Sequence, residues 1–111
     1  MIGYGQTVIT MSSNDATPHD VATDWLTGNI YWTETKAGSR ATNGHTTGLI
    51  MMAKGDGRYK RSVVTSGLES PTSVAVDPEH GLMYWSDAGN YPKIEKAWMD
   101  GSKRQVIGKI Q

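Results

Sequence analysis

Apolar and polar residues alternate along the chain in short segments, and turn-forming residues bound each segment. A period of two over four to eight residues is typical of half-buried β-strands. Between these segments stand Gly, Pro, Asn and Asp, which suit tight turns and left-handed backbone. In the C-terminal half the pattern predicts strands near residues 73–76, 82–87, 93–99 and 104–107.

The same pattern occurs twice. Residues 18–24 align with residues 71–77, and the N-terminal copy predicts strands near residues 19–24, 29–34, 49–53 and 61–65. Four antiparallel strands per repeat are typical of a propeller blade, so we predict an all-β fold of two blades. Val8 and Ile9 stand where each copy has its fourth strand, which predicts a lone outer strand of a preceding blade.

The repeat divides the chain into three parts. Residues 1–17 are expected to hold the outer strand and a linker, residues 18–70 the first blade, and residues 71–111 the second blade. The first copy is longer because of a Gly-, Thr- and Ser-rich stretch at residues 35–49, which has no apolar periodicity. We interpret this stretch as a long loop.

Charge and composition exclude several partners. Eleven basic and eleven acidic residues give no net charge, so we expect neither nucleic-acid binding nor direct contact with a membrane. Four Trp and five Tyr supply apolar area that disordered chains lack. Without Cys the chain has no disulfide and no thiolate metal ligand. We expect no signal peptide and no membrane span.

A search for catalytic chemistry finds none. His19, His45 and His80 are far apart in sequence and show no metal-binding spacing. Ser66 has no identifiable base, and Asp24 and Asp77 occupy the same position in the two copies, which favours a turn role. We therefore expect no catalytic residue, no metal and no cofactor.

Each copy carries a four-residue aromatic and acidic motif. The two motifs are Tyr31-Trp32-Thr33-Glu34 and Tyr84-Trp85-Ser86-Asp87. With the flanking Asp and Gly residues, they resemble the YWTD repeats, or class B repeats, of the low-density lipoprotein receptor family. The stretch at residues 89–102 is similar to the large receptor-related, or megalin-type, members. The resemblance covers nearly the whole chain and implies part of a six-bladed β-propeller.

The resemblance also implies a setting and a role for the motif. Such propellers belong to extracellular parts of cell-surface receptors, lie beside Cys-rich EGF-like modules, and take part in endocytosis or signalling. In the family the motif's aromatic residues pack between blades, and its acid binds backbone across the blade junction, so both motifs are expected to be structural. Three residues depart from the pattern: Glu34 replaces the usual Asp, Thr23 stands where an apolar inner-strand residue such as Val76 is expected, and Ala88 stands where the family often has Trp. The longer Glu34 must displace a hydrogen bond or the backbone that it meets.

Binding is expected on loops that a rigid scaffold presents. Propellers bind over the face where the fourth strand of one blade leads into the first strand of the next. Secreted proteins or peptides are the expected ligands, and neighbouring blades and EGF-like modules the expected partners within a longer chain. Besides the loop at residues 40–45, the candidate ligand-binding residues are His19, Asp20, Thr72, Ser73, Asn90 and Tyr91.

Two alternatives stay open. One is a fragment of a six-bladed hydrolase or lactonase, which would need a metal or an acid–base cluster in its central channel. The other is a structural unit whose open blade flanks self-associate, with three copies closing a six-bladed ring.

Overall fold

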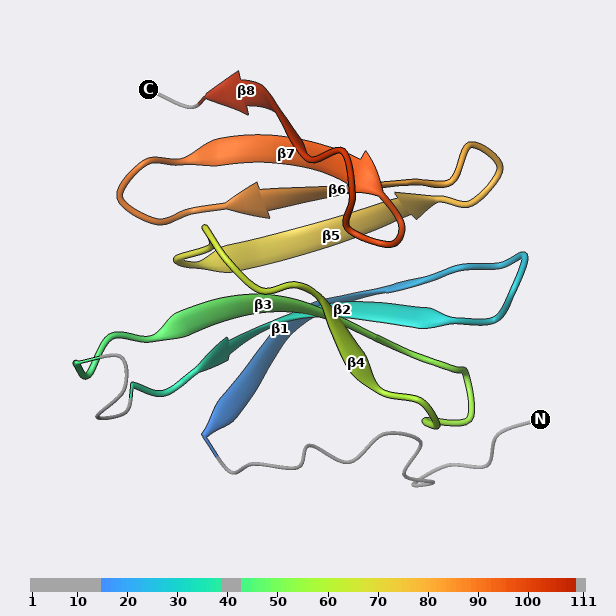
Figure 1. The fold of residues 1–111 in the computed structure, drawn as a ribbon, viewed down its shortest axis with the longest axis horizontal. Coiled ribbons are helices and arrows are strands. Elements are labelled where there is room, and N and C mark those ends of the chain that lie inside the picture. The colour runs from blue at the N-terminus through green and yellow to red at the C-terminus, as the bar shows by residue number, and fades with distance from the viewer. Residues whose placement is uncertain (1–14, 39–42, 110–111) are drawn as a thin grey trace.

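The computed structural model describes residues 15–38 and 43–109, which form two four-stranded antiparallel sheets (Figure 1). Both sheets follow chain order. The prediction of an all-β fold with two blades is confirmed, while the outer strand expected at Val8 and Ile9 falls outside the described residues. The first blade contains β1 (Ala16–Thr23), β2 (Ile30–Lys36), β3 (Thr47–Ala53) and β4 (Arg61–Val64), and the second contains β5 (Pro71–Asp77), β6 (Leu82–Asp87), β7 (Lys93–Trp98) and β8 (Gln105–Lys109).

The innermost strands, β1 and β5, begin earlier than the sequence pattern predicts. β1 passes through Pro18, and β5 begins at Pro71. Proline donates no backbone hydrogen bond, and within sheets it is confined to edges, strand starts and bulges. Here the strand register shifts immediately after each proline, so that one residue bulges out of the ladder. The bulge lets the strand extend through a residue that normally ends it.

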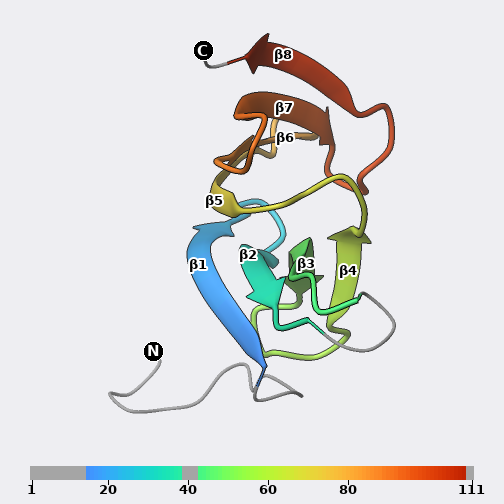
Figure 2. The ribbon, with the colours of Figure 1, turned by 90° about the vertical axis from the view of Figure 1, so that its left-hand side faces the viewer.

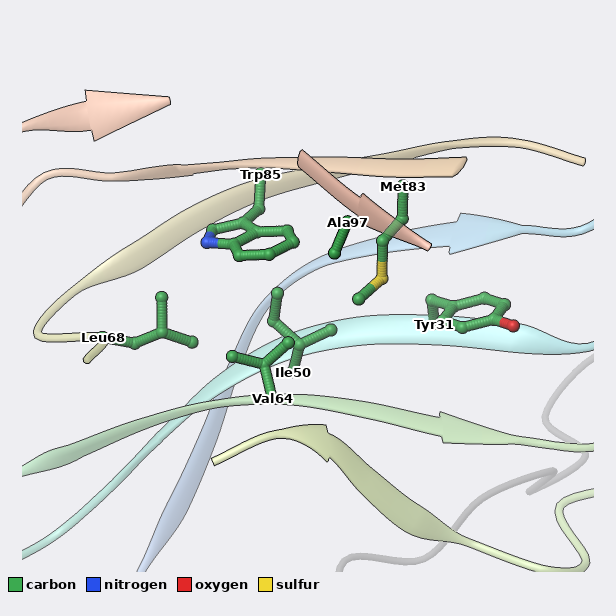
Figure 3. Packing of buried hydrophobic residues seen from close by; sticks show 7 residues of the cluster. All are labelled: Tyr31, Ile50, Val64, Leu68, Met83, Trp85 and Ala97. Atoms are coloured by element: carbon green, nitrogen blue, oxygen red, sulfur yellow. The ribbon is translucent and has the colours of Figure 1, made fainter. Parts of the chain in front are cut away.

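The hydrophobic core lies between the two blades (Figure 3). The first blade contributes Tyr31, Ile50 and Val64, and the side chain of Leu68 comes from the linker between the blades. The second blade covers them with the buried side chains of Met83, Trp85 and Ala97. The main apolar cluster of the described residues is therefore the junction between the blades.

The turns gather at two opposite ends of the blades (Figure 1). The β2–β3 and β6–β7 loops share one end with the linker from β4 to β5, on the left of the figure. We call this the linker end. The β1–β2, β3–β4, β5–β6 and β7–β8 turns lie at the other, which we call the hairpin end. Any site built from loops must belong to one of these two ends.

The inner strands β1 and β5 lie side by side across the junction (Figure 2). A hydrogen bond joins the two strands in the middle: Oδ2 of Asp20 accepts from the backbone N–H of Val74 at 2.9 Å. β5 also contacts β2 and β3. The second blade is thus held against the first by both apolar packing and a backbone-directed carboxylate.

Candidate functional site

The two bulges place His19 and Thr72 at equivalent positions at the linker end. A bulge re-aims the side chain that it carries. The imidazole Nε2 of His19 lies 2.9 Å from the hydroxyl of Thr35, and the hydroxyl of Thr72 lies 2.9 Å from that of Ser86. Both bulged side chains are exposed, so each blade presents one polar group held by a side chain on the second strand.

Asp20 and Ser73, which follow the two bulges, make different contacts. Asp20 uses Oδ2 to accept from Val74 across the junction. Ser73 is exposed, and its hydroxyl lies 2.5 Å from the hydroxyl of Ser86. One oxygen of Asp20 therefore helps to join the blades, whereas Ser73 faces solvent.

The β6–β7 loop brings Asn90 and Tyr91 to the same end. Tyr91 is 82% exposed. The backbone N–H of Asn90 donates to the Glu69 carboxylate in the linker at 3.4 Å, so the loop lies against the chain that enters the second blade. Among the other loop residues expected to bind, His45 is exposed, and Arg40 lies outside the described residues.

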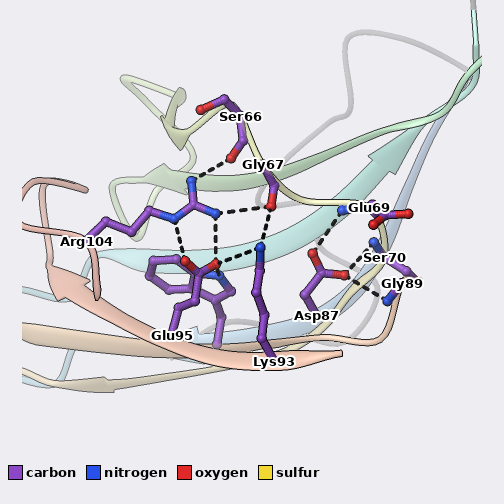
Figure 4. A network of polar contacts seen from close by, with 10 residues as sticks. Ser66, Gly67, Glu69, Ser70, Asp87, Gly89, Lys93, Glu95 and Arg104 are labelled. Carbon is purple, nitrogen blue, oxygen red and sulfur yellow. Dashed lines mark hydrogen bonds and ion pairs between the residues drawn. The ribbon is translucent and has the colours of Figure 1, made fainter. Parts of the chain in front are cut away.

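Asp87, at the end of the second motif, fixes the linker. Its carboxylate accepts backbone hydrogen bonds from Glu69 at 2.9 Å, Ser70 at 2.8 Å and Gly89 at 3.0 Å (Figure 4). The side chain is buried, and a buried carboxylate is costly unless it is hydrogen-bonded. These three donors therefore tie the linker and the start of the β6–β7 loop to one charge.

A second polar cluster secures the same linker from the outer side of the blade. Buried Glu95 accepts from the Trp85 indole N–H at 3.1 Å and forms a two-pronged ion pair with Arg104, at 2.9 and 2.8 Å. The Arg104 guanidinium also donates to the backbone carbonyls of Ser66, at 2.6 Å, and Gly67, at 3.2 Å. Figure 4 shows the contacts that run from Glu95 through Arg104 to Ser66 and Gly67 of the linker.

Sequence reasoning missed Glu95 and Arg104. Strand register supplies the signal that could have found them, because Glu95 is the ladder partner of Trp85. A carboxylate beside the motif tryptophan, followed by an arginine where the next strand begins, predicts a buried ion pair once the hairpin is aligned.

The first blade satisfies its motif tryptophan differently. The ladder partner of Trp32 is Met51, which cannot serve as a strong acceptor. The indole N–H of Trp32 instead donates to Oε1 of Glu34 at 2.8 Å, and both side chains are buried. The extra methylene that separates Glu34 from the usual Asp thus lets the acid reach back to its own tryptophan.

At the hairpin end, a buried carboxylate closes one of the turns. The buried carboxylate of Asp24 accepts backbone hydrogen bonds from Leu26 at 2.9 Å and Thr27 at 3.2 Å, which closes the β1–β2 turn. The pKa of Tyr31 is raised above its ordinary value, mainly by burial and further by the nearby carboxylate of Asp24. The Asp24 interaction is the turn role that its repeated position predicts.

Two features, a cluster of metal ligands and a membrane-spanning helix, are absent from the described part of the chain. Among residues 15–38 and 43–109, no group of three or more His, Asp or Glu side chains lies close enough together to hold a metal ion. Within the same residues, no helix has the length and hydrophobicity needed to cross a membrane.

Comparisons with known proteins agree with the repeat. Residues 81–108 match the profile of the low-density lipoprotein receptor repeat class B. The chain is 36% identical over 105 residues to the vitellogenin receptor Yl of Drosophila melanogaster, a match that covers 95% of this chain and 5% of the receptor. It is 30% identical over 102 residues to the human low-density lipoprotein receptor-related protein 5-like protein, covering 92% of this chain and 36% of that protein.

A solved structure supports the fold. A chain of the crystal structure of a nidogen/laminin complex superimposes with a TM-score of 0.57 at 24% sequence identity, over 86% of this chain and 49% of that chain. Profile, relatives and fold therefore agree: the chain contains a low-density lipoprotein receptor class B repeat at residues 81–108 and is similar over most of its length to receptors of that family, of which it spans only a part.

Proposed function

We propose that this chain is a non-catalytic, extracellular segment of a receptor propeller and that the linker end binds a secreted protein or peptide, in an endocytic or signalling receptor. The receptors that it resembles support this role. The observation that carries the proposal is the repeated presentation of polar groups at one end of two packed blades, with Tyr91 beside them.

The linker end combines rigidity with exposure. Asp87, Glu95 and Arg104 hold the linker at several backbone groups, so the neighbouring loop starts from a fixed base. From that base Tyr91 projects with 82% of its surface exposed. An exposed tyrosine on a rigid support supplies a large contact area at low entropic cost, which is why tyrosine is enriched among binding hot spots.

The proposed ligand-binding residues share this end. The inner strands carry two bulged positions (His19 and Thr72) and the two that follow them (Asp20 and Ser73), and the β6–β7 loop carries Asn90 and Tyr91. Hydroxyl, imidazole and amide groups suit a polar peptide, and Tyr91 suits an apolar anchor beside it.

Binding to immobilised chain, measured against a panel of purified secreted proteins, tests the proposal. We expect saturable binding of at least one of them, weakened by about tenfold or more in Tyr91→Ala, as for a hot-spot residue. Trp25→Ala is the matched control, because Trp25 is also exposed but lies in the β1–β2 turn at the hairpin end. No saturable binding across the panel, or equal losses in the two variants, would contradict the proposal.

A further inference from the structure

The β3–β4 hairpin concentrates positive charge on a chain that is neutral as a whole. Residues 54–61 contain Lys54, Arg58, Lys60 and Arg61 against a single acid, Asp56. The hairpin lies at the hairpin end of the first blade, away from the surface proposed above. This local excess is an electrostatic feature that the net charge of the chain conceals.

Three of these basic residues, Lys54, Lys60 and Arg61, line a hollow. Its volume is about 460 Å³, within the range of roughly 300–1,000 Å³ that is usual for small-ligand sites. Arg61 is one of its lining residues, and its Nε lies 3.3 Å from the Met52 sulfur. The lining residues are Asn29, Met52, Lys54, Tyr59, Lys60 and Arg61.

Folding accounts for the shape of the hairpin. The β3–β4 and β7–β8 turns are built alike: Asp56 and Asp100 each accept from the backbone N–H two residues later. Gly57 has a φ of 87° and Gly101 one of 88°, both in the region that favours glycine. The shared residues are sufficient to form the turn.

The same comparison shows that folding does not require the basic residues. Strand register pairs Met52 with Arg61 and Lys96 with Gln105, so an uncharged residue replaces Arg61 in the second blade. At the start of the turn, Trp98 of the second blade takes the place of Lys54. Lys60 has a basic counterpart in Arg104, so the charges that belong to the first blade alone are those of Lys54 and Arg61, and these two call for an explanation other than the fold.

The acids near these cations are engaged in turns, and Asp100, which interacts electrostatically with Arg61, is hydrogen-bonded to Ser102. Asp56 pairs with Arg58 at 2.6 Å, and buried Asp24 is occupied by the β1–β2 turn. Neither carboxylate has a hydrogen bond to Lys54 or Arg61. Both basic side chains are exposed beside the hollow, so an incoming anion gains their charge at little desolvation cost.

An aromatic ring completes the site. Tyr59 is 70% exposed, and the Nζ of Lys54 lies 5.8 Å from its ring centre. The Arg58 guanidinium also lies over this ring, 5.6 Å from its centre. An exposed phenol ring can pack against the C–H face of a sugar while the neighbouring cations contact sulfate groups. Side chains line the hollow, whereas peptides recognised by strand addition bind along backbone edges.

We infer that this hollow binds a segment of a sulfated polysaccharide. Lys54, Lys60 and Arg61 contact sulfate groups, Asn29 bonds a hydroxyl, and Tyr59 packs on a sugar ring. The concave shape suits a chain that enters the hollow better than it suits the flat surface of a lipid bilayer. The site is independent of the ligand proposed for the linker end.

Titration of the chain with a size-defined heparin oligosaccharide tests the inference. We expect Lys54→Gln/Arg61→Gln to weaken binding about tenfold or more, and the affinity of the unaltered chain to fall as salt rises. Lys36→Gln/Lys109→Gln removes the same charge at the linker end and should change affinity by less than about twofold. Equal losses in the two double variants would overturn the inference.

Two further probes separate charge from sugar recognition. Poly-glutamate supplies negative charge without sugar rings, and vesicles containing phosphatidylserine supply an anionic membrane. We expect Tyr59→Ala to weaken the oligosaccharide complex about fivefold, in line with the loss of one stacking contact. Binding to poly-glutamate or to vesicles as tight as to the oligosaccharide would contradict a polysaccharide site. Tyr91→Ala should leave oligosaccharide binding unchanged, so failure here is distinguishable from failure of the proposed function.

Discussion

The two blades carry the same motif but satisfy its tryptophan in different ways. In the second blade Trp85 donates to Glu95 on the neighbouring strand, which leaves Asp87 to bind the linker. In the first blade Met51 stands opposite Trp32, and Glu34 accepts the indole hydrogen bond itself. The second blade thus uses one acid to accept from the indole and another to bind the linker, whereas in the first blade the motif acid itself accepts from the indole. The requirement that is conserved between the blades is a buried acceptor for the indole N–H.

The division of tasks has a consequence for the junction. The second blade meets the linker that enters it with the carboxylate of Asp87 and the guanidinium of Arg104, which together bind both N–H and C=O groups of residues 66–70. These bonds hold an irregular segment, exposed at Ser66, Gly67 and Glu69, against the second blade. The polar cluster and the apolar core are therefore two parts of one junction.

Replacement of Glu95 by the residue of the first blade should have the largest effect. In Glu95→Met the Trp85 indole and the Arg104 guanidinium lose their buried acceptor, which we expect to lower the free energy of unfolding by about 3–5 kcal/mol. Urea unfolding followed by tryptophan fluorescence measures the loss. If Glu95→Met does not fold, Glu95→Gln keeps the shape and an acceptor, and it should still unfold more easily than the unaltered chain. A change below about 1 kcal/mol in both would contradict a structural ion pair.

Neutralising the motif acid should have the next largest effect, and it should differ between the two blades. Asp87→Asn leaves one oxygen for three backbone N–H donors and turns an amide N–H₂ toward at least one of them, so we expect a loss of about 2–3 kcal/mol. Glu34→Gln is the matched control. Its amide oxygen can still accept from Trp32, and the expected loss is below about 1 kcal/mol. Faster hydrogen exchange at the Glu69 and Ser70 amides in Asp87→Asn alone would locate the effect, and equal losses in both variants would remove the distinction.

An exchange of acids in the first blade tests whether the two solutions are interchangeable. Glu34→Asp shortens the side chain that reaches Trp32 and should cost about 1–2 kcal/mol. Met51→Glu, added to it, supplies the ladder acceptor that the second blade uses, and it should recover about half of that loss. A thermodynamic cycle over the two single variants and the double variant measures this coupling. Strict additivity would show that an acid at position 51 does not accept from the Trp32 indole as Glu95 accepts from the Trp85 indole.

Most of the fold follows from local pattern, and most of the polar junction does not. The boundaries of β6 are those that the alternation predicts, because Met83, Trp85 and Asp87 face the junction while their neighbours face away. The bulges depend on pairing between strands, so the sequence of one strand cannot reveal them. The contacts of Glu95 and Arg104 likewise depend on which residues stand opposite each other. The basic hairpin was visible as residue types, but the hollow that it forms requires the position of Asn29 from another turn.

The smallest expected difference concerns the third position of the motif. In the second blade the Ser86 hydroxyl is paired with Thr72 and Ser73, whereas Oγ1 of Thr33 is fully buried without a hydrogen-bond partner in the described part of the chain. An unpaired buried hydroxyl costs free energy, so Thr33→Val, which keeps the shape, should stabilise the chain by about 1 kcal/mol. Ser86→Ala removes exposed hydrogen bonds and should lower stability by about 0.5 kcal/mol. Thermal unfolding of both variants gives the sign of each change, and a destabilising Thr33→Val would mean that this hydroxyl is paired after all, as its counterpart is.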